Sequence, residues 1–188
     1  MRVLALVLLC LLGACHHLSQ DTFGYEKSSE GTLNTPEYGP IHVTIWYQFS
    51  TMEETHSPDE VAIVIYDTMK TWEHTHGALN QNSLRYFQDL TIYVVDDQSS
   101  LWQDYCGDKP DDFYRVYACS HPYEYWAENF DIAIADRDFN DQHSYNSFAH
   151  ESIHALQWFE NGIIDRDHTS LDWNLVDQAT NEARMDLE

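Results

Sequence analysis

The chain has 188 residues and a mass of 22.0 kDa, which suits one domain of ordinary size with a short appendage. Its 32 acidic and 9 basic residues give a formal net charge of −23 at pH 7, so polyanions are repelled and nucleic acid is excluded as a partner. A hydrophobic content of 43%, with 14% aromatic residues, lies far from the composition of disordered chains, so a packed core is expected.

The N-terminus has the pattern of an export signal. Arg2 supplies a basic start, and an apolar run of about ten residues follows it, which is too short to span a bilayer. The LGAC sequence at 12–15 resembles the lipobox of bacterial lipoproteins, in which the chain is cut before a cysteine that then carries lipid. This resemblance implies a signal peptide over 1–14 and lipidation of Cys15. Ordinary secretory cleavage near Ala14 or Cys15 is the alternative.

Export implies a location outside the cytoplasm and an oxidising environment for the cysteines. The expected location is the bacterial cell envelope, with the lipid as the sole contact with the membrane; a periplasmic or secreted protein is the alternative. If Cys10 leaves with the signal peptide and Cys15 carries lipid, Cys106 and Cys119 remain. An even pair in an oxidising compartment predicts a disulfide, and two reduced, buried thiols are the alternative.

The first part of the mature chain reads as a tether. Residues 15–40 are polar and are interrupted by glycine and proline, so the folded domain is expected over 41–188. Apolar and polar residues alternate over 41–49, which predicts a strand. A serine, proline and glutamate in the spacing of a capping box then start a helix at Pro58, which is expected to end before Gly77.

Three short strands and two helices are expected after that helix. Aromatic and β-branched runs bounded by turn residues predict strands over 90–95, 113–119 and 132–135. Length and apolar spacing predict helices over 144–161 and 171–187. The order gives an α+β fold with a mixed four-stranded sheet, one helix packed on it, and two further helices.

The first of the two late helices carries a motif with chemical meaning. His150, Glu151 and His154 form an HExxH sequence within it. Histidines at positions i and i+4 lie on the same side of a helix, so both imidazoles can bind one cation. The adjacent glutamate can take a proton from a water molecule that the metal activates. A solvated helix face that carries these residue types by chance is the alternative.

A zinc ion needs a third protein ligand, and the last helix offers candidates. At about 100° per residue, Glu182 and Asp186 lie in the middle of the apolar face of that helix. Because burying an unpaired charge is costly, these carboxylates are expected to be paired or to bind a metal. Fraying of the helix into water is the alternative, and His168, Asp172 and Asp177 are lesser candidates for the third ligand.

The HExxH sequence, followed by NEARMD at 181–186, resembles the zincin metallopeptidases of the gluzincin branch, which carry HExxH on one helix and NExxxD on the next. The resemblance implies a minimal zincin fold with one catalytic Zn²⁺ and three protein ligands, His150, His154 and Glu182. It further implies that Glu151 is the general base and that Asp186 orients His150.

Two further features follow from this resemblance. Zincins pair an extended substrate with the strand before the active helix, which here is 132–135. Members of the branch commonly stabilise the transition state with a histidine or tyrosine in a C-terminal subdomain, but neither residue type follows Glu182 in this sequence. His168 and Tyr145 are therefore the candidates for that role. The metzincin pattern does not apply, because Gln157 stands where that pattern has glycine.

A second, weaker metal pattern precedes the active helix. Asp136, Asp138, Asn140 and Asp141 resemble the first positions of a calcium loop, although Ser147 stands where such loops have glutamate. A solvated acidic turn is the alternative.

The sequence thus predicts an exported zinc metallopeptidase that acts on peptides or proteins. The missing downstream histidine or tyrosine supports the alternative of a non-catalytic, zincin-like envelope lipoprotein that binds zinc or a protein partner. A structural or adhesive surface domain without metal is the third possibility.

Overall fold

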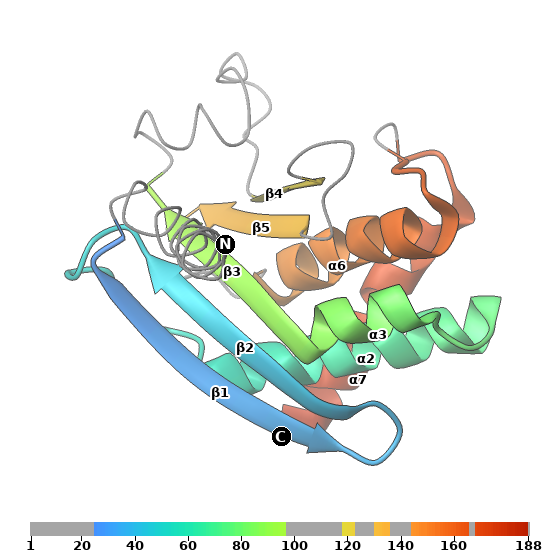
Figure 1. Ribbon diagram of the computed structural model, residues 1–188, viewed down its shortest axis with the longest axis horizontal. Helices are drawn as coiled ribbons and strands as arrows, with labels where there is room; N and C mark the ends of the chain where they lie inside the picture. The colour runs from blue at the N-terminus through green and yellow to red at the C-terminus, as the bar shows by residue number, and fades with distance from the viewer. Residues whose placement is uncertain (1–24, 97–117, 123–129, 136–143, 166–167, 188) are drawn as a thin grey trace, which may run out of the picture.

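The computed structural model describes residues 25–96, 118–122, 130–135, 144–165 and 168–187. This part of the chain is α+β, as predicted, and it contains a mixed five-stranded sheet with four α-helices (Figure 1). None of its helices is long and apolar enough to cross a membrane. The predicted signal peptide, the lipidation site at Cys15 and the acidic run that resembles a calcium loop lie outside the described residues.

The sheet has the strand order β1-β2-β3-β5-β4. β1 (Lys27–Thr35) is antiparallel to β2 (Gly39–Tyr47), which is parallel to β3 (Asp89–Val95). β3 is in turn parallel to β5 (Phe130–Ala135), and β4 (Ala118–Pro122) pairs antiparallel with the far side of β5. Among the described strands, none pairs with the outer side of β4, so β4 forms one edge of the sheet.

The helices pack together on one face of this sheet (Figure 1). α2 (Pro58–His76) is the connection between the parallel strands β2 and β3, together with the short α3 (Gln81–Gln88). α6 (Ser144–Asn161) follows β5, and a 3-10 turn, η1 (Leu171–Trp173), leads into α7 (Asn174–Leu187). α7 packs mainly on α2, while α6 lies between α2 and the edge strand β4.

The boundaries of α2 confirm the capping pattern that the sequence contains. The Ser57 side chain accepts a hydrogen bond from the Glu60 backbone N–H (3.2 Å), and the Glu60 carboxylate accepts one from the Ser57 backbone N–H (2.7 Å). Gly77 ends the helix with a φ of 95°, in the left-handed region that glycine tolerates.

A single main core fills the space between the sheet and the helices. Alternate residues of each central strand point into it, which is the period that the sequence predicted for β2. Burying each large aliphatic side chain contributes roughly 1.5–3 kcal/mol. The strand residues that are fully buried in this core are Ile41, Val43, Ile45, Tyr47, Leu90, Ile92, Val94, Ile132 and Ile134.

The structure corrects the prediction in two places. Residues 27–40 were expected to belong to the tether, but they form β1, a turn over 36–38 and the start of β2. β1 is an edge strand whose residues alternate between half-buried and exposed, so polar side chains suffice and no apolar period marks it. α3 was not predicted; its Asn80 cap accepts hydrogen bonds from two backbone N–H groups. The strand predicted over 113–119 is described only from Ala118 onward.

A buried carboxylate lies where α2 meets α7. Asp67 is fully buried, and neither of its carboxylate oxygens has a hydrogen-bond partner among the described residues. The Nζ atom of Lys70 lies 3.8 Å from Oδ1. Burial raises the pKa of Asp67 from 3.8 to about 6; repulsion from Asp186 and Glu182 adds to the rise, and Lys70 opposes it.

We predict that Asp67→Asn weakens the pH dependence of stability. Between pH 3.8 and about pH 6 the folded protein holds a proton on Asp67 that the unfolded chain has released, so the free energy of unfolding falls as the pH rises through this window. Asp67 accounts for at most about 3 kcal/mol of that fall, since each pKa unit corresponds to about 1.4 kcal/mol. Urea denaturation at pH 4 and pH 7 measures this change in the free energy of unfolding.

Asp177→Asn is the matched control, because Asp177 is an exposed acidic residue of α7. Stability should fall between the two pH values as much in this variant as in the parent, and less in Asp67→Asn. An equal fall in all three proteins would contradict the prediction.

Candidate metal centre

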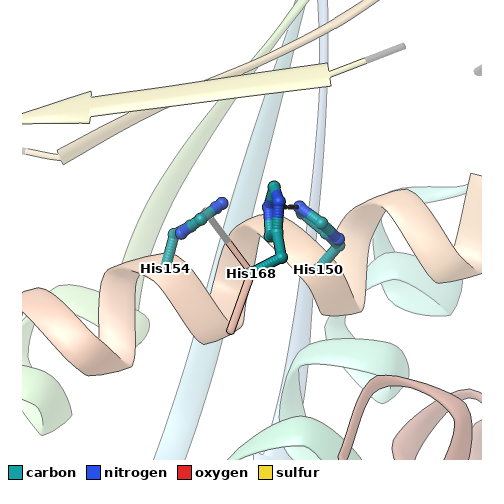
Figure 2. A group of neighbouring side chains, drawn as sticks. All are labelled: His150, His154 and His168. Carbon is teal, nitrogen blue, oxygen red and sulfur yellow. Dashed lines mark hydrogen bonds between the residues drawn. The ribbon is translucent and has the colours of Figure 1, made fainter. Parts of the chain in front are cut away.

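Three histidines gather on one side of α6 (Figure 2). His150 and His154 project from the helix one turn apart, and His168 reaches them from the segment between α6 and η1. One ring nitrogen from each lies within 4.8 Å of the other two, and the Nε2 atoms of His150 and His168 are 3.1 Å apart. The three side chains are therefore close enough together to hold a metal ion.

The electrostatics of this group suit a metal site. Burial, with added repulsion from neighbouring imidazoles, lowers the pKa of His150 to about 4 and that of His154 to about 3. Both rings are thus neutral at physiological pH, and the neutral imidazole is the form that binds metals. Within the described part of the chain, Nδ1 of His154 is buried without a hydrogen-bond partner. A buried polar atom without a partner is costly, and a bound ion or water would relieve that cost.

The third histidine takes the place that the sequence analysis assigned to Glu182. Glu182 lies against α2 instead, where it accepts hydrogen bonds from Thr71 (3.5 Å) and from Gln178 one turn earlier in α7 (3.0 Å). The structure therefore does not bring Glu182 to the histidines, because its carboxylate is bound where α7 meets α2. His168, a lesser candidate in the sequence, joins the group.

Two more predicted residues also lie apart from the histidines. Asp186 does not orient His150, because it lies near Asp67 of α2 and raises the pKa of that carboxyl group. Tyr145 packs against the ring of His56, with 5.0 Å between ring centres. No hydrogen bond or ring contact within the described residues joins Tyr145 to the histidine group.

Asp172 and Asp177, the lesser candidates for the third ligand, also lie away from the histidines. Asp172 pairs with His76 of α2, with 3.0 Å between Oδ1 and Nε2, and it accepts a hydrogen bond from Gln157. Asp177 is exposed in the first turn of α7. Neither carboxylate is in the histidine group.

Glu151 lies between the two helix histidines and faces the edge strand β4. Its carboxylate is almost fully buried, and Oε2 accepts a hydrogen bond of 2.5 Å from the Ser120 hydroxyl. Burial raises the pKa of Glu151 to about 7, and the hydrogen bond from Ser120 opposes this rise. The carboxyl group can therefore exchange a proton near neutral pH.

The edge strand beside Glu151 differs from the one that was expected. The strand over 132–135 was predicted to meet an extended substrate, but β5 is enclosed between β3 and β4. Of the two edge strands among those described, β1 and β4, it is β4 that lies beside Glu151. Cys119 of β4 is disulfide-bonded. Its predicted partner, Cys106, lies outside the described residues, so that pairing stays a prediction.

Sequence reasoning missed the aromatic residue behind the histidines. The ring centre of Trp173 lies 4.6 Å from that of His150, 4.8 Å from that of His154 and 4.3 Å from that of His168. Ser120, the partner of Glu151, was missed as well. Neither residue stands at a fixed distance from HExxH, so no local signal could have indicated them.

Together the fold and the site define an α+β domain in which two histidines of one helix and a third from the segment after it form a group, with a buried glutamate beside it. No protein-family model matches the sequence, and comparison with curated proteins and with solved structures found no match. Inferences about function therefore rest on the chemistry and geometry of the residues themselves.

We predict that Ser120→Ala raises the pKa of Glu151 above about 7 in the metal-free protein. The hydroxyl donates to the ionised carboxylate, so its removal disfavours the charged form while burial stays the same. Carboxyl ¹³C chemical shifts measured across a pH titration report this pKa. Ser120→Thr, which keeps a hydroxyl, and Ser28→Ala, at an exposed position of β1, should titrate like the parent. An unchanged titration in Ser120→Ala would disprove the effect.

We also predict that His168→Ala weakens metal binding far more than Glu182→Ala does. Loss of a direct ligand should raise the dissociation constant by more than roughly 100-fold, because changes to the supporting residues of metal sites already cost about 10–100-fold. Competition with a chromophoric chelator for Zn²⁺ measures this constant. His74→Ala is the matched control, since His74 is an exposed histidine of α2. If Glu182→Ala lost most of its affinity for Zn²⁺ and His168→Ala lost none, Glu182 and not His168 would be the third ligand.

Proposed function

We propose that this protein is a zinc-dependent metallopeptidase. The observation that carries the proposal is the convergence of His150, His154 and His168 beside the glutamate of the HExxH motif. A catalytic zinc typically has three protein ligands and one open position, and three neutral imidazoles supply such a set. Two nitrogens bound at ~2.0–2.1 Å to one tetrahedral zinc lie roughly 3.3 Å apart. The separation of 3.1 Å between the Nε2 atoms of His150 and His168 is close to that value.

Glu151 is the general base in this proposal. Zinc, when bound, supplies Lewis acidity that activates water and polarises a peptide carbonyl. Glu151 accepts the proton of the attacking water and returns it to the departing amine, and a pKa near 7 suits a group that must do both. Ser120 holds Oε2, which leaves Oε1 available for that proton.

The edge strand β4 is the proposed platform for the substrate. An exposed strand edge presents backbone N–H and C=O groups with which an extended peptide can pair. Ser120 of β4 contacts Glu151, so a peptide aligned along this edge passes close to the base. The net charge of −23 favours the approach of cationic peptides over long distances. We further propose export to the cell envelope with a lipid at Cys15, on the basis of the N-terminal pattern.

A non-catalytic metal-binding envelope protein is the second candidate. One observation favours it: neither residue expected to stabilise the transition state is free for that role, because His168 is part of the metal group and Tyr145 packs on His56. This candidate shares the metal site and the location with the first. The two candidate functions differ only in whether the protein cleaves peptides.

We predict that Glu151→Gln abolishes peptide cleavage while it preserves zinc binding. Loss of a general base typically costs about 10²–10⁴-fold in rate, and glutamine keeps the shape of the side chain. Cleavage of a quenched-fluorescence peptide library, with zinc content measured in parallel, is the experiment. Glu182→Gln, on the far side of α7, should retain both properties. Equal cleavage by Glu151→Gln and the parent would exclude this mechanism, whereas a full zinc content without cleavage by the parent would favour the second candidate.

A further inference from the structure

The segment that carries His168 is held by hydrogen bonds centred on Asp165. Oδ2 of Asp165 accepts hydrogen bonds from the Ser170 backbone N–H (2.6 Å) and from the Trp173 indole N–H (2.9 Å). Oδ1 accepts one from the Thr169 hydroxyl (3.4 Å), and the Asp165 backbone carbonyl accepts one from the His168 N–H (3.3 Å). The Asp165 side chain, three residues before His168, thus binds three residues that follow His168.

Gln157 connects this segment to α6. Its side chain is almost fully buried; Oε1 accepts a hydrogen bond from the Asp165 backbone N–H (3.1 Å), and Nε2 donates to Asp172 (2.9 Å) and to Ser170 (3.3 Å). Gln157 lies three residues after His154 on the same helix. The helix that supplies two histidines therefore also fixes the start and the end of the segment that supplies the third.

Trp173 links the same hydrogen bonds to the imidazole rings. Its indole N–H is bound by Asp165, and its ring lies 4.3–4.8 Å from the ring centres of all three histidines. Asp165 therefore fixes both the backbone around His168 and the aromatic surface against which the three imidazoles rest. The hydrogen bonds from Ser170 and Trp173 hold the pKa of Asp165 well below its usual range, so it accepts these bonds as a carboxylate.

The backbone at His168 shows that this support is needed. His168 has a φ of 54°, in the left-handed region that residues other than glycine seldom adopt. Such a conformation is unfavourable in isolation and persists when the surroundings determine it. His168 is also exposed, so burial does not hold it in place. The hydrogen bonds around Asp165 hold its backbone, and contacts with Trp173 and the two helix histidines hold its ring.

We propose that Asp165 is a positioning residue that places His168 for metal binding before the ion arrives. Without this carboxylate the segment would have to become ordered as the metal binds, and that loss of conformational freedom would subtract from the affinity. The inference rests on the proposed metal site, and it does not require peptidase activity.

The test compares Asp165→Asn with Asp177→Asn in the full exported chain. Both substitutions neutralise one carboxylate, but Asp177 lies on the exposed face of α7. We expect the dissociation constant for Zn²⁺ to rise about 10–100-fold in Asp165→Asn and to stay unchanged in Asp177→Asn. The melting midpoints of the two metal-free variants should be similar, which separates loss of positioning from loss of fold. Equal affinity in the two variants, whether retained or weakened, would overturn the proposal.

A second measurement needs no metal. The indole N–H of Trp173 should be protected from hydrogen exchange in the metal-free parent, because it is bound by Asp165, and unprotected in Asp165→Ala, which removes the acceptor. The resonance is assigned by its absence in Trp173→Phe. If the parent protein binds no Zn²⁺ but its indole N–H is protected, the proposed function is wrong. The hydrogen bonds that hold the segment of His168 are then still supported. An unprotected indole in the parent would overturn that support itself.

Trp173→Phe also serves if Asp165→Asn does not fold, because it removes one donor and keeps an aromatic ring. We expect a smaller rise in the Zn²⁺ dissociation constant than in Asp165→Asn, but a measurable one. An unchanged constant in that variant would count against the proposal.

Discussion

The rotation of α6 about its own axis determines where the histidine nitrogens lie. Phe148, Ile153 and Leu156 anchor the helix by full burial in the core beneath the sheet. Because side chains three and four residues apart share a face, this packing fixes the direction in which His150 and His154 leave the other side of the helix. Interiors are close-packed, so the helix cannot turn without opening cavities. The relative placement of these two imidazoles is thus a consequence of hydrophobic packing.

Local patterns in the sequence were sufficient for the parts of the fold that depend on neighbours along the chain. The caps of α2, the alternation in β2 and the HExxH turn of α6 involve residues within a few positions of each other, so their structures follow from short-range physics. β1 was not predicted, because it is stabilised by backbone hydrogen bonds to β2 and its polar sequence has no apolar period.

The third histidine of the group could not be deduced in the same way. The sequence places Glu182 on an apolar face, but it does not say which neighbour that face meets, and in the fold the neighbour is α2. One result is the repulsion that Glu182 and Asp186 exert on the buried Asp67. His168, by contrast, lies in an irregular segment with a left-handed backbone, where no periodic signal exists. Its placement is visible only once the chain folds back on α6.

α6 therefore contributes to each part of the candidate metal centre. It supplies two histidines directly, Gln157 ties the segment of His168 to it, and Glu151 reaches from it to Ser120 on the edge strand. A ligand that binds the folded form alone stabilises that form, by an amount that grows with the logarithm of its affinity. Since all these groups require the packed helix, an ion bound here would stabilise the docking of α6, the segment after it and β4 as one unit. Metal loss would for the same reason loosen the edge of the sheet together with the centre.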